Sequence, residues 1–389
     1  MRVPDFIEGN QITLLHNGEE YFPALETAID AAQLEIYLET YIFEYDATGI
    51  LIAAALKRAA QRGVAVRLLI DGFGSFNLPS AMIQELLAVG VQVLIYRQEF
   101  FSFQLKRYRL RRMHRKLAVM DARIAFVGGI NIIDDYHEPD ALWPRFDYAV
   151  EIKGPLLRKI HAAARHLWML VAWAHFKKRW ADDLCIDQDA LPTGKQRAAF
   201  VIRDNLRNRR SIERCYLKAI ASARQEIIIA NAYFLPGLNF RHALIKAARR
   251  GVSVILLLQG KIEYRLQYYA TRALYGSLLD AGISIYEYQQ GYLHAKVAVV
   301  DHIWSTVGSS NIDPFSLLLA REANVIISDR IFATELRNSL QQALATSSPI
   351  LQHFWNRYSW LRRGLNWVCY YFVRVLQGLS GYSREGSRI

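Results

Sequence analysis

The sequence has few cysteines, a shortage of acidic residues relative to basic ones, and no long uninterrupted apolar run. Its cysteines, Cys185, Cys215 and Cys369, lie far apart and show neither a disulfide framework nor the spacing of a zinc site. We therefore expect a reducing compartment. Lysine and arginine outnumber aspartate and glutamate by 48 to 36, which favours a polyanionic partner, either nucleic acid or an anionic membrane surface.

Signals for secretion and for membrane crossing are also missing. The first residues, "MRVPDFIEGNQ", contain no apolar core of a signal peptide. No charge-free apolar run approaches the ~18 residues that a transmembrane helix needs. We therefore expect a protein of the cytoplasm that has no transmembrane segment but is able to lie on a membrane surface.

The same pattern of segments occurs twice along the chain. Each copy has basic helices that end at glycine and are followed by apolar strands. The matching pairs are "IDAAQLEI" (29–36) with "IASARQEI" (220–227), "ALKRAAQRGV" (55–64) with "ALIKAARRGV" (243–252), and "LAVGVQVLIY" (87–96) with "LDAGISIYEY" (279–288). Alternating strands and helices predict an α/β fold with a mostly parallel sheet in the repeated part.

These matches divide the chain into four parts. We predict a first repeat over 9–165, a connecting helix and linker over 166–197, a second repeat over 198–350 and a separate tail over 351–389. The linker is polar and contains a Pro-Thr-Gly turn signal. The first repeat also holds extra residues, largely in the segment 98–113.

The most informative match is "HRKLAVMDARIAFVGGIN" (114–131) with "HAKVAVVDHIWSTVGSSN" (294–311). In a strand, side chains two residues apart point to the same face, so each His-x-Lys pair projects together. One such pair is an ordinary surface feature. Two copies with the same aspartate, glycine and asparagine at the same intervals predict a shared site with two imidazoles and two ammonium groups.

Such a site suits phosphate better than metal. Two lysines repel a cation, and no cage of carboxylates is present. Lysine neutralises phosphate oxygens, and asparagine, serine and a glycine-rich loop donate hydrogen bonds to them. One imidazole can attack phosphorus while the other protonates the leaving oxygen. The predicted phosphate-binding residues are Gly129, Asn131, Ser309 and Asn311, and no metal or other cofactor is expected.

The doubled motif H-x-K-x-x-x-x-D followed by G-[GS]-x-N resembles that of the phospholipase D superfamily. Further segments, including "EGNQITLLHNGEEYFPAL", "IIIANAYFLPG" and "STVGSSNIDPFSL", are similar to bacterial cardiolipin synthases of the B type. The resemblance extends to about residue 350. It implies two tandem α/β repeats, each with a mixed sheet flanked by helices, packed as a pseudo-twofold bilobal unit with one active site between them.

The resemblance also assigns roles. His114 forms a phosphatidyl-histidine intermediate, and His294 protonates the departing alcohol and deprotonates the acceptor. Asp147 and Glu322 stand where the family places carboxylates that orient the histidines. The residues grouped as catalytic are His114, Lys116, Asp121, His294, Lys296 and Asp301, although we expect the two aspartates to brace loops. The spacing is symmetric, so it does not decide which histidine is the nucleophile.

Three segments outside the motifs mix aromatic and basic residues, as the headgroup layer of a membrane favours. They are 98–113, 166–180 and 354–379. The first contains Phe100, Phe101, Phe103, Tyr108, Lys106, Arg107, Arg109, Arg111 and Arg112. For 166–180, a helix packed in the core is an equally good interpretation. For the tail we favour a helix lying in the membrane interface.

We therefore predict a cardiolipin synthase that moves a phosphatidyl group between two molecules of phosphatidylglycerol, on the cytoplasmic face of a bacterial cell membrane. Its expected partner is an anionic membrane containing phosphatidylglycerol and cardiolipin, without nucleic acid. The donor headgroup and the oligomeric state stay open, with phosphatidylethanolamine as another donor. Three alternatives also stay open: a lipid-hydrolysing phosphodiesterase, a single-strand nuclease, because aromatics and arginines also bind single strands, and an inactive lipid-binding scaffold.

Overall fold

The computed structural model describes residues 4–97, 112–137, 142–177, 180, 191–204, 208–313, 320–357 and 359–377. Residues 98–111 of the aromatic and basic segment 98–113 lie outside this description. These residues include all the aromatic side chains of that segment. Residues 181–190 of the predicted linker and the end of the tail, 378–389, lie outside it as well.

The first repeat alternates strands with helices and then ends in three strands and a long helix. Its elements are β1 (Ile7–His16), α1 (Asn17–Ala31), β2 (Glu35–Thr40), α2 (Ala47–Gln61), β3 (Ala65–Asp71), α3 (Ser80–Ala88), β4 (Gln92–Tyr96), β5 (Lys116–Met120), β6 (Ile124–Gly128), β7 (Tyr148–Lys153) and α4 (Leu157–Ala174). The helix α4 runs across the division that the sequence predicts after residue 165.

The second repeat has the same order of elements. They are β8 (Gln196–Arg203), α5 (Ser211–Ser222), β9 (Glu226–Asn231), α6 (Leu238–Arg249), β10 (Ser253–Gln259), α7 (Arg265–Arg272), α8 (Tyr275–Leu279), β11 (Ser284–Tyr288), β12 (Lys296–Val300), β13 (Trp304–Gly308), β14 (Glu322–Ser328) and α10 (Arg330–Ala345). The tail adds β15 (Ser348–Pro349), α11 (Gln352–Asn356) and α12 (Trp360–Gln377).

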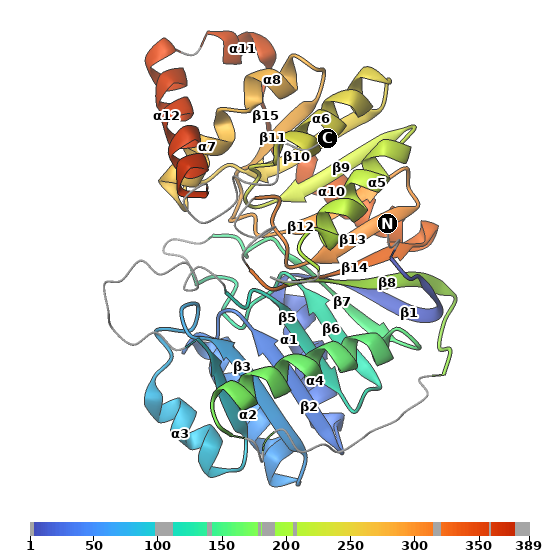
Figure 1. Cartoon of the computed structure of the whole chain (residues 1–389), viewed down its shortest axis with the longest axis vertical. Helices are drawn as coiled ribbons and strands as arrows, with labels where there is room; N and C mark the ends of the chain where they lie inside the picture. The colour runs from blue at the N-terminus through green and yellow to red at the C-terminus, as the bar shows by residue number, and fades with distance from the viewer. Residues whose placement is uncertain are drawn as a thin grey trace.

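All these strands form one 15-stranded sheet in the order β15-β11-β10-β9-β12-β13-β14-β8-β1-β7-β6-β5-β2-β3-β4. The order is symmetric about the antiparallel pair β1 and β8 at the centre. In each repeat the early strands, β2-β3-β4 and β9-β10-β11, are parallel, whereas the motif strands and the central pair are antiparallel. The prediction of a mostly parallel sheet is therefore wrong, because a short turn rather than a crossover helix joins β5 to β6 and β12 to β13. The predicted α/β fold of two repeats with mixed sheets is thus confirmed, and Figure 1 shows the repeats as a lower and an upper lobe.

Helices cover both faces of this sheet. On one face, α4 and α10 pack against strands of both repeats and form a shared core. On the other face, each repeat has its own core, which is lined by α1 to α3 in the first and by α5, α6 and α8 in the second. The continuous core on one face fixes the two lobes against each other, as a single site between them requires.

The repeated "RGV" sequence forms the same helix end in both repeats. Gly63 and Gly251 follow α2 and α6 with φ of +88° and +89°, a conformation that glycine adopts without steric cost. The side chains of the preceding residues, Arg62 and Arg250, donate to backbone carbonyls at the ends of α1 and α5 respectively, at 3.0 to 3.3 Å. Each repeat therefore ties two helix ends together before its next strand begins.

The segment 166–180 belongs largely to α4 and packs in the core. Leu167, Trp168 and Val171 are buried on one face of the helix, whereas Leu170 and Trp173 are exposed on the other. The core interpretation of this segment therefore holds for one face. The exposed face leaves the membrane-facing interpretation untested.

The helix α12 packs against α7 at the outer edge of the second lobe (Figure 1). One side of it, with Asn366, Tyr370 and Val373, is buried. The opposite side is exposed and strongly apolar; it carries Leu361, Leu365, Val368, Phe372 and Val375. In the part of the chain that the structure describes, no helix combines the length and apolar character needed to cross a bilayer.

Candidate active site

The two His-x-Lys segments meet at the boundary between the repeats. The N–H of His114 donates to the carbonyl of Arg321 at 2.9 Å, and the N–H of His294 donates to the carbonyl of Phe146 at 2.9 Å. Each motif histidine is therefore held by a backbone contact with the opposite repeat. The histidines are close enough that His114 contributes to lowering the pKa of His294, after larger contributions from burial and from nearby lysine and arginine charges.

Each histidine is oriented by a carboxylate from the other repeat. Nδ1 of His114 lies 3.0 and 3.1 Å from the two carboxylate oxygens of Glu322, and Nδ1 of His294 lies 2.6 Å from Oδ2 of Asp147. Both carboxylates are almost fully buried. A hydrogen bond at Nδ1 fixes the ring and leaves Nε2 for chemistry. The structure thus brings both predicted orienting residues to the histidines, in a crossed pairing that sequence order does not reveal.

The two motif lysines are buried beside the histidines. Nζ of Lys116 donates to the carbonyl of His114 at 2.9 Å. Nζ of Lys296 donates to the carbonyl of His294 and lies 3.5 Å from Oδ2 of Asp147. Burial raises the pKa of Asp147 to about 6, although the charge of Lys296 opposes this shift. The site therefore places two lysines and two carboxylates together where water screens their charges weakly.

Burial lowers the pKa of every basic group in the site. It lowers the pKa of His114, against the opposing effect of Glu322, and it lowers the pKa of His294 well below the usual value, with Lys296 adding to the effect. Burial first and Lys296 second lower the pKa of Lys116 to about 7, and burial lowers that of Lys296 to about 8. Both imidazoles are therefore neutral at neutral pH until an anion arrives. A bound phosphodiester stabilises the protonated lysines and a protonated general acid.

The two glycine-rich loops accommodate their carboxylates in different ways. Oγ of Ser309 donates to Oε2 of Glu322 at 2.5 Å. At the matching position in the first repeat, a Cβ atom on Gly129 would overlap the carboxylate of Asp147. The serine therefore holds one carboxylate, and the glycine leaves room for the other. Direct contact of either loop with phosphate stays a prediction.

The two motif asparagines are buried just after these loops. Oδ1 of Asn131 accepts the N–H of Ile42 at 3.2 Å and so links the loop to the chain after β2. Within the described residues, Oδ1 of Asn311 has no hydrogen-bond partner. Their predicted role in binding phosphate stays a prediction.

The motif aspartates lie at the far end of the motif strands from the histidines. The carboxylate of Asp121 accepts the backbone N–H groups of residues 33–35, each at 2.8 Å, and that of Asp301 accepts those of residues 224–226 at 2.8 to 3.0 Å. A strand of 5 residues separates each aspartate from the histidine end of its motif. The structure therefore corrects their grouping with the catalytic residues: they brace turns, as expected.

Two residues near the histidines were missed by the sequence analysis. The ring of Tyr41 lies edge-on to His114, with centroids 4.8 Å apart, and Lys116 stands over its face at 5.2 Å. Arg203 pairs with Glu322 across β8 and β14, so both side chains share a face of the sheet. No sequence signal marks either residue, because both reach the site from other strands.

Arg203 stands out because it is a buried guanidinium without hydrogen bonds in the described part of the chain. Among the described residues, none of its three guanidinium nitrogens has a hydrogen-bond partner. Burial lowers its pKa to about 10, while Glu322 opposes this shift.

No group of three or more histidine, cysteine, aspartate or glutamate side chains in the described part of the chain could hold a metal ion. Metal independence itself stays a prediction.

Comparison with protein families gives a consistent match. The model described as "Cardiolipin synthase, PLD-like domain" matches residues 25–168 and 216–344. Cardiolipin synthase B of Escherichia coli K12 is 41% identical over 376 residues, which cover 96% of this chain and 90% of that protein. A cardiolipin synthase of Geobacillus thermodenitrificans is 32% identical over 347 residues, covering 88% of this chain and 67% of that protein.

Solved structures share the fold at low sequence identity. A phosphatidylserine synthase of Haemophilus influenzae aligns with a TM-score of 0.69 at 14% identity, covering 95% of this chain and 94% of that one. A polyphosphate kinase of Porphyromonas gingivalis aligns with a TM-score of 0.55 at 13% identity, covering 95% of this chain and 56% of that one. Given the doubled motif, the crossed histidine–carboxylate pairs and the family match over both repeats, the chain belongs to the cardiolipin synthase family of phospholipase D-like phosphatidyltransferases.

Proposed function

We propose that this protein makes cardiolipin by transferring a phosphatidyl group, from phosphatidylglycerol as the favoured donor, to a hydroxyl of another phosphatidylglycerol molecule. One observation carries the proposal: a buried and a mostly buried imidazole, each anchored at Nδ1 by a carboxylate, stand with two buried lysines. This set supplies a nucleophile, a proton carrier and charge for a phosphodiester in one place.

The reaction has two balanced steps. First, Nε2 of His114 attacks phosphorus, the bond from phosphorus to the headgroup oxygen breaks, and His294 gives its proton to the departing alcohol. Second, His294 takes a proton from the hydroxyl of the acceptor, whose oxygen attacks phosphorus as the phosphorus–nitrogen bond breaks. One phosphodiester replaces another, so the reaction needs no nucleotide.

The lysines and carboxylates support these steps without forming bonds to phosphorus. Lys116 and Lys296 neutralise the non-bridging oxygens as charge builds up on them. Glu322 and Asp147 stabilise each imidazole while it is positively charged, His114 as the phosphorylated intermediate and His294 as the acid. If water replaces the alcohol in the second step, the product is phosphatidic acid.

We further propose that the exposed face of α12 rests on the cytoplasmic surface of an anionic bacterial membrane. Large contiguous apolar patches on a protein surface mark interaction sites. The loops after β3 and β10 also expose apolar side chains, namely Phe73, Phe76, Ile262 and Tyr264. Because α12 packs on α7, which directly follows the second loop, the apolar face and the loop lie on neighbouring elements.

The rival functions of the same superfamily predict other products. A nuclease would degrade single-stranded DNA, a lipid hydrolase would yield only phosphatidic acid, and a scaffold would turn over nothing. The apolar face of α12 favours a lipid substrate over a nucleic acid. Intact His-x-Lys pairs with their carboxylates favour an enzyme over a scaffold.

The test is to incubate purified protein with vesicles of labelled phosphatidylglycerol, with and without a chelator. We expect labelled cardiolipin from the wild type, unchanged by EDTA, and none from His114→Ala or His294→Ala. Loss of activity with EDTA would contradict the metal-free site. Absence of lipid turnover together with cleavage of single-stranded DNA would favour the nuclease.

The membrane proposal has its own test, the double substitution Val368→Glu and Phe372→Glu on the exposed face of α12. Burial of a large apolar side chain contributes about 1.5–3 kcal/mol, so vesicle affinity should fall about tenfold or more. The matched control is Arg330→Glu, a surface charge change on α10. Vesicle sedimentation measures both, and an unchanged affinity of the double variant would refute a role of α12.

A further inference from the structure

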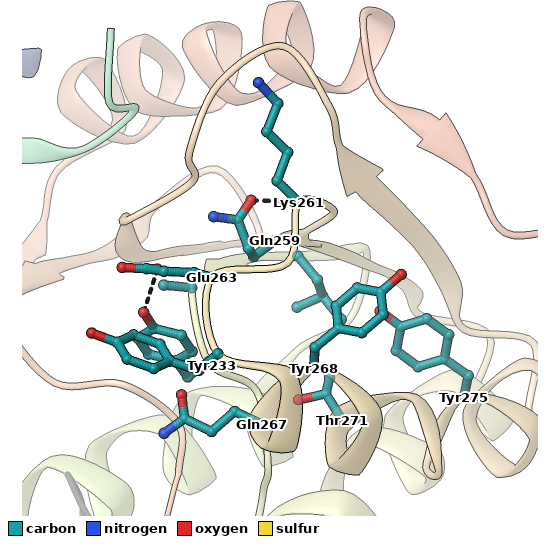
Figure 2. Close-up of a pocket in the computed structure, with 11 residues that line it drawn as sticks. Tyr233, Gln259, Lys261, Glu263, Gln267, Tyr268, Thr271 and Tyr275 are labelled. Carbon is teal, nitrogen blue, oxygen red and sulfur yellow. Dashed lines mark hydrogen bonds between the residues drawn. The ribbon is translucent and has the colours of Figure 1, made fainter. Parts of the chain in front are cut away.

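A cavity lined by aromatic and polar residues lies in the second repeat, beside the motif segment that carries His294. The space within it, including the part that is open to solvent, is about 350 Å³, and it is lined by residues from the ends of β9 and β10, from α7 and its preceding loop, and from α8. Figure 2 shows Tyr233, Gln259 and Gln267 approaching it from three of these segments. None of these residues belongs to the doubled motif.

Two backbone contacts place this cavity next to the catalytic histidine of the second repeat. The N–H of Ala232, a lining residue, donates to the carbonyl of Ala295 at 3.1 Å. Oε1 of Gln259, also in the lining, accepts the N–H of Leu293 at 3.3 Å. Leu293 and Ala295 are the immediate neighbours of His294, so two walls of the cavity are fixed to its backbone.

The matching positions beside His114 carry different side chains. Tyr41 occupies the position that matches Ala232, and its ring packs on His114. Asp71 matches Gln259 and likewise accepts the N–H of the residue before the histidine, at 2.8 Å, but its other oxygen is used by its own loop. The backbone contacts around the cavity are therefore duplicated beside His114, but the side chains at the two matching positions differ.

The cavity has unused hydrogen-bonding groups of both kinds. Nε2 of Gln259, a buried donor, and Oε1 of Gln267, a buried acceptor, have no partner among the residues that the structure describes. A buried polar group without a partner is costly, and a ligand that supplies the missing bonds recovers this cost. A hydroxyl group both donates and accepts, so several adjacent hydroxyls match this set.

The charges around the cavity favour a neutral ligand. The hydroxyl of Tyr233 donates to the carboxylate of Glu263 at 2.5 Å (Figure 2), and this carboxylate would repel a phosphate. Nζ of Lys261 turns away from the cavity and donates to the carbonyl of Gln290 at 2.9 Å. The cavity thus offers amide, hydroxyl and carboxylate groups, without an ammonium aimed into it from the lining.

We propose that this cavity binds the hydroxyl-bearing alcohol part of the substrates: the polyol headgroup that leaves in the first step and the one that accepts in the second. In-line attack by His114 places the leaving oxygen on the opposite side of phosphorus, towards His294. The acceptor must approach from that same side, so one cavity beside His294 serves both alcohols. The inference rests on the proposed function and on His114 as its nucleophile.

The test separates binding of the alcohol from attack on the donor. The donor is phosphatidyl-p-nitrophenol in neutral detergent micelles, whose leaving group needs neither the cavity nor a proton. Glycerol is the soluble acceptor and competes with water for the phosphorylated histidine. The measured quantities are the glycerol concentration that gives half-maximal transfer and the ratio of phosphatidylglycerol to phosphatidic acid.

The variants are Gln259→Glu, which keeps the acceptor for the N–H of Leu293 but removes the donor, and Gln267→Leu, which removes the free acceptor. Each should raise the half-saturating glycerol concentration about 3- to 10-fold and lower the product ratio by the same factor, as loss of one hydrogen bond predicts. Tyr269→Phe, on the same helix but outside the lining, is the matched control and should change neither quantity. A general loss of chemistry or folding would reduce both products together and leave the ratio unchanged.

An unchanged product ratio in both cavity variants would overturn this inference and leave the proposed function intact. Saturation of the wild type by ethanolamine at a lower concentration than glycerol would also overturn it, because it would assign the tyrosine-lined cavity to an ammonium group. Failure of the wild type to release p-nitrophenolate would instead overturn the proposed function itself.

Discussion

The two halves of the active site are built from matching positions but differ in what surrounds each histidine. His114 has a longer carboxylate, Glu322, that is held by Ser309, and it is covered by Tyr41. His294 has a shorter carboxylate, Asp147, that fits against a glycine. A cavity lined by aromatic and polar residues lies beside it.

This difference suits the two unlike roles of the proposed mechanism. A nucleophile benefits from a fixed ring with little free space around it, because its position relative to phosphorus is critical. A proton carrier that serves an alcohol needs room beside it for that alcohol. The duplicated backbone supplies two equivalent histidines, and substitutions around each one break the equivalence.

The most severe test of this comparison is to remove each histidine and use a donor with a p-nitrophenol leaving group. His114→Ala should lose at least about 10⁴-fold in rate and form no covalent intermediate. His294→Ala should still release a burst of p-nitrophenolate, because this leaving group needs no proton, and should then stall. Stopped-flow absorbance and intact-protein mass measure the burst and the adduct, and the reverse pattern would exchange the two roles.

The next test neutralises each orienting carboxylate. Glu322→Gln should slow formation of the phosphorylated histidine, and Asp147→Asn should slow its transfer to the acceptor, each by about 10²- to 10⁴-fold, because the imidazolium loses its countercharge. Rapid quench separates the two steps. If both variants slowed the same step equally, Glu322 and Asp147 would not support separate steps through their two histidines.

A smaller effect is expected from the loop residues that set the two carboxylates. Gly129→Ala places a methyl group into the carboxylate of Asp147 and should lower the rate by about 10-fold or more, since a displaced orienting group misaligns the imidazole. Ser309→Ala removes one hydrogen bond to Glu322 and should cost about 0.5–1.5 kcal/mol, or about 3- to 10-fold. The rate of phosphatidylglycerol turnover measures both effects. An unchanged rate in Gly129→Ala would refute the close packing of Gly129 against the carboxylate of Asp147.

The final test is the pH dependence of kcat/KM, which reports the free enzyme. As pH falls through about 6, Asp147 gains a proton and loses its attraction for the imidazolium of His294. As pH rises through about 7 and then about 8, Lys116 and Lys296 lose their charges and the phosphodiester binds less well. We therefore expect kcat/KM to be highest between about pH 6 and 7 and to fall by up to about tenfold per pH unit on either side.

A lysine-to-arginine exchange checks the basic limb of this profile. Arginine keeps its charge above pH 8, so Lys116→Arg should move the basic limb upwards, whatever its effect on the absolute rate. A short-chain soluble diester avoids the local pH of a charged membrane surface. If the basic limb of the kcat/KM profile lies at the same pH in Lys116→Arg as in the wild type, the limb reports the titration of another group.

Sequence by itself determined the repeats, the fold class and the two His-x-Lys pairs of the motifs. Their spacing is a local property: residues two apart on a strand share a face, and a glycine after a basic helix ends it. Both statements hold without knowledge of the rest of the chain. The motif pair also carried the family resemblance, because its polar residues occur twice at equal intervals.

Only the tertiary structure decided which residues meet. The pairing of His114 with Glu322 and of His294 with Asp147 crosses between repeats, and the sheet order that produces it follows from packing of distant strands. The exclusion of Asp121 and Asp301 from the site has the same origin, because a strand has two ends and only one reaches the boundary. Side chains near the histidines that come from other strands, such as Tyr41 and Gln259, become visible only once that boundary is formed.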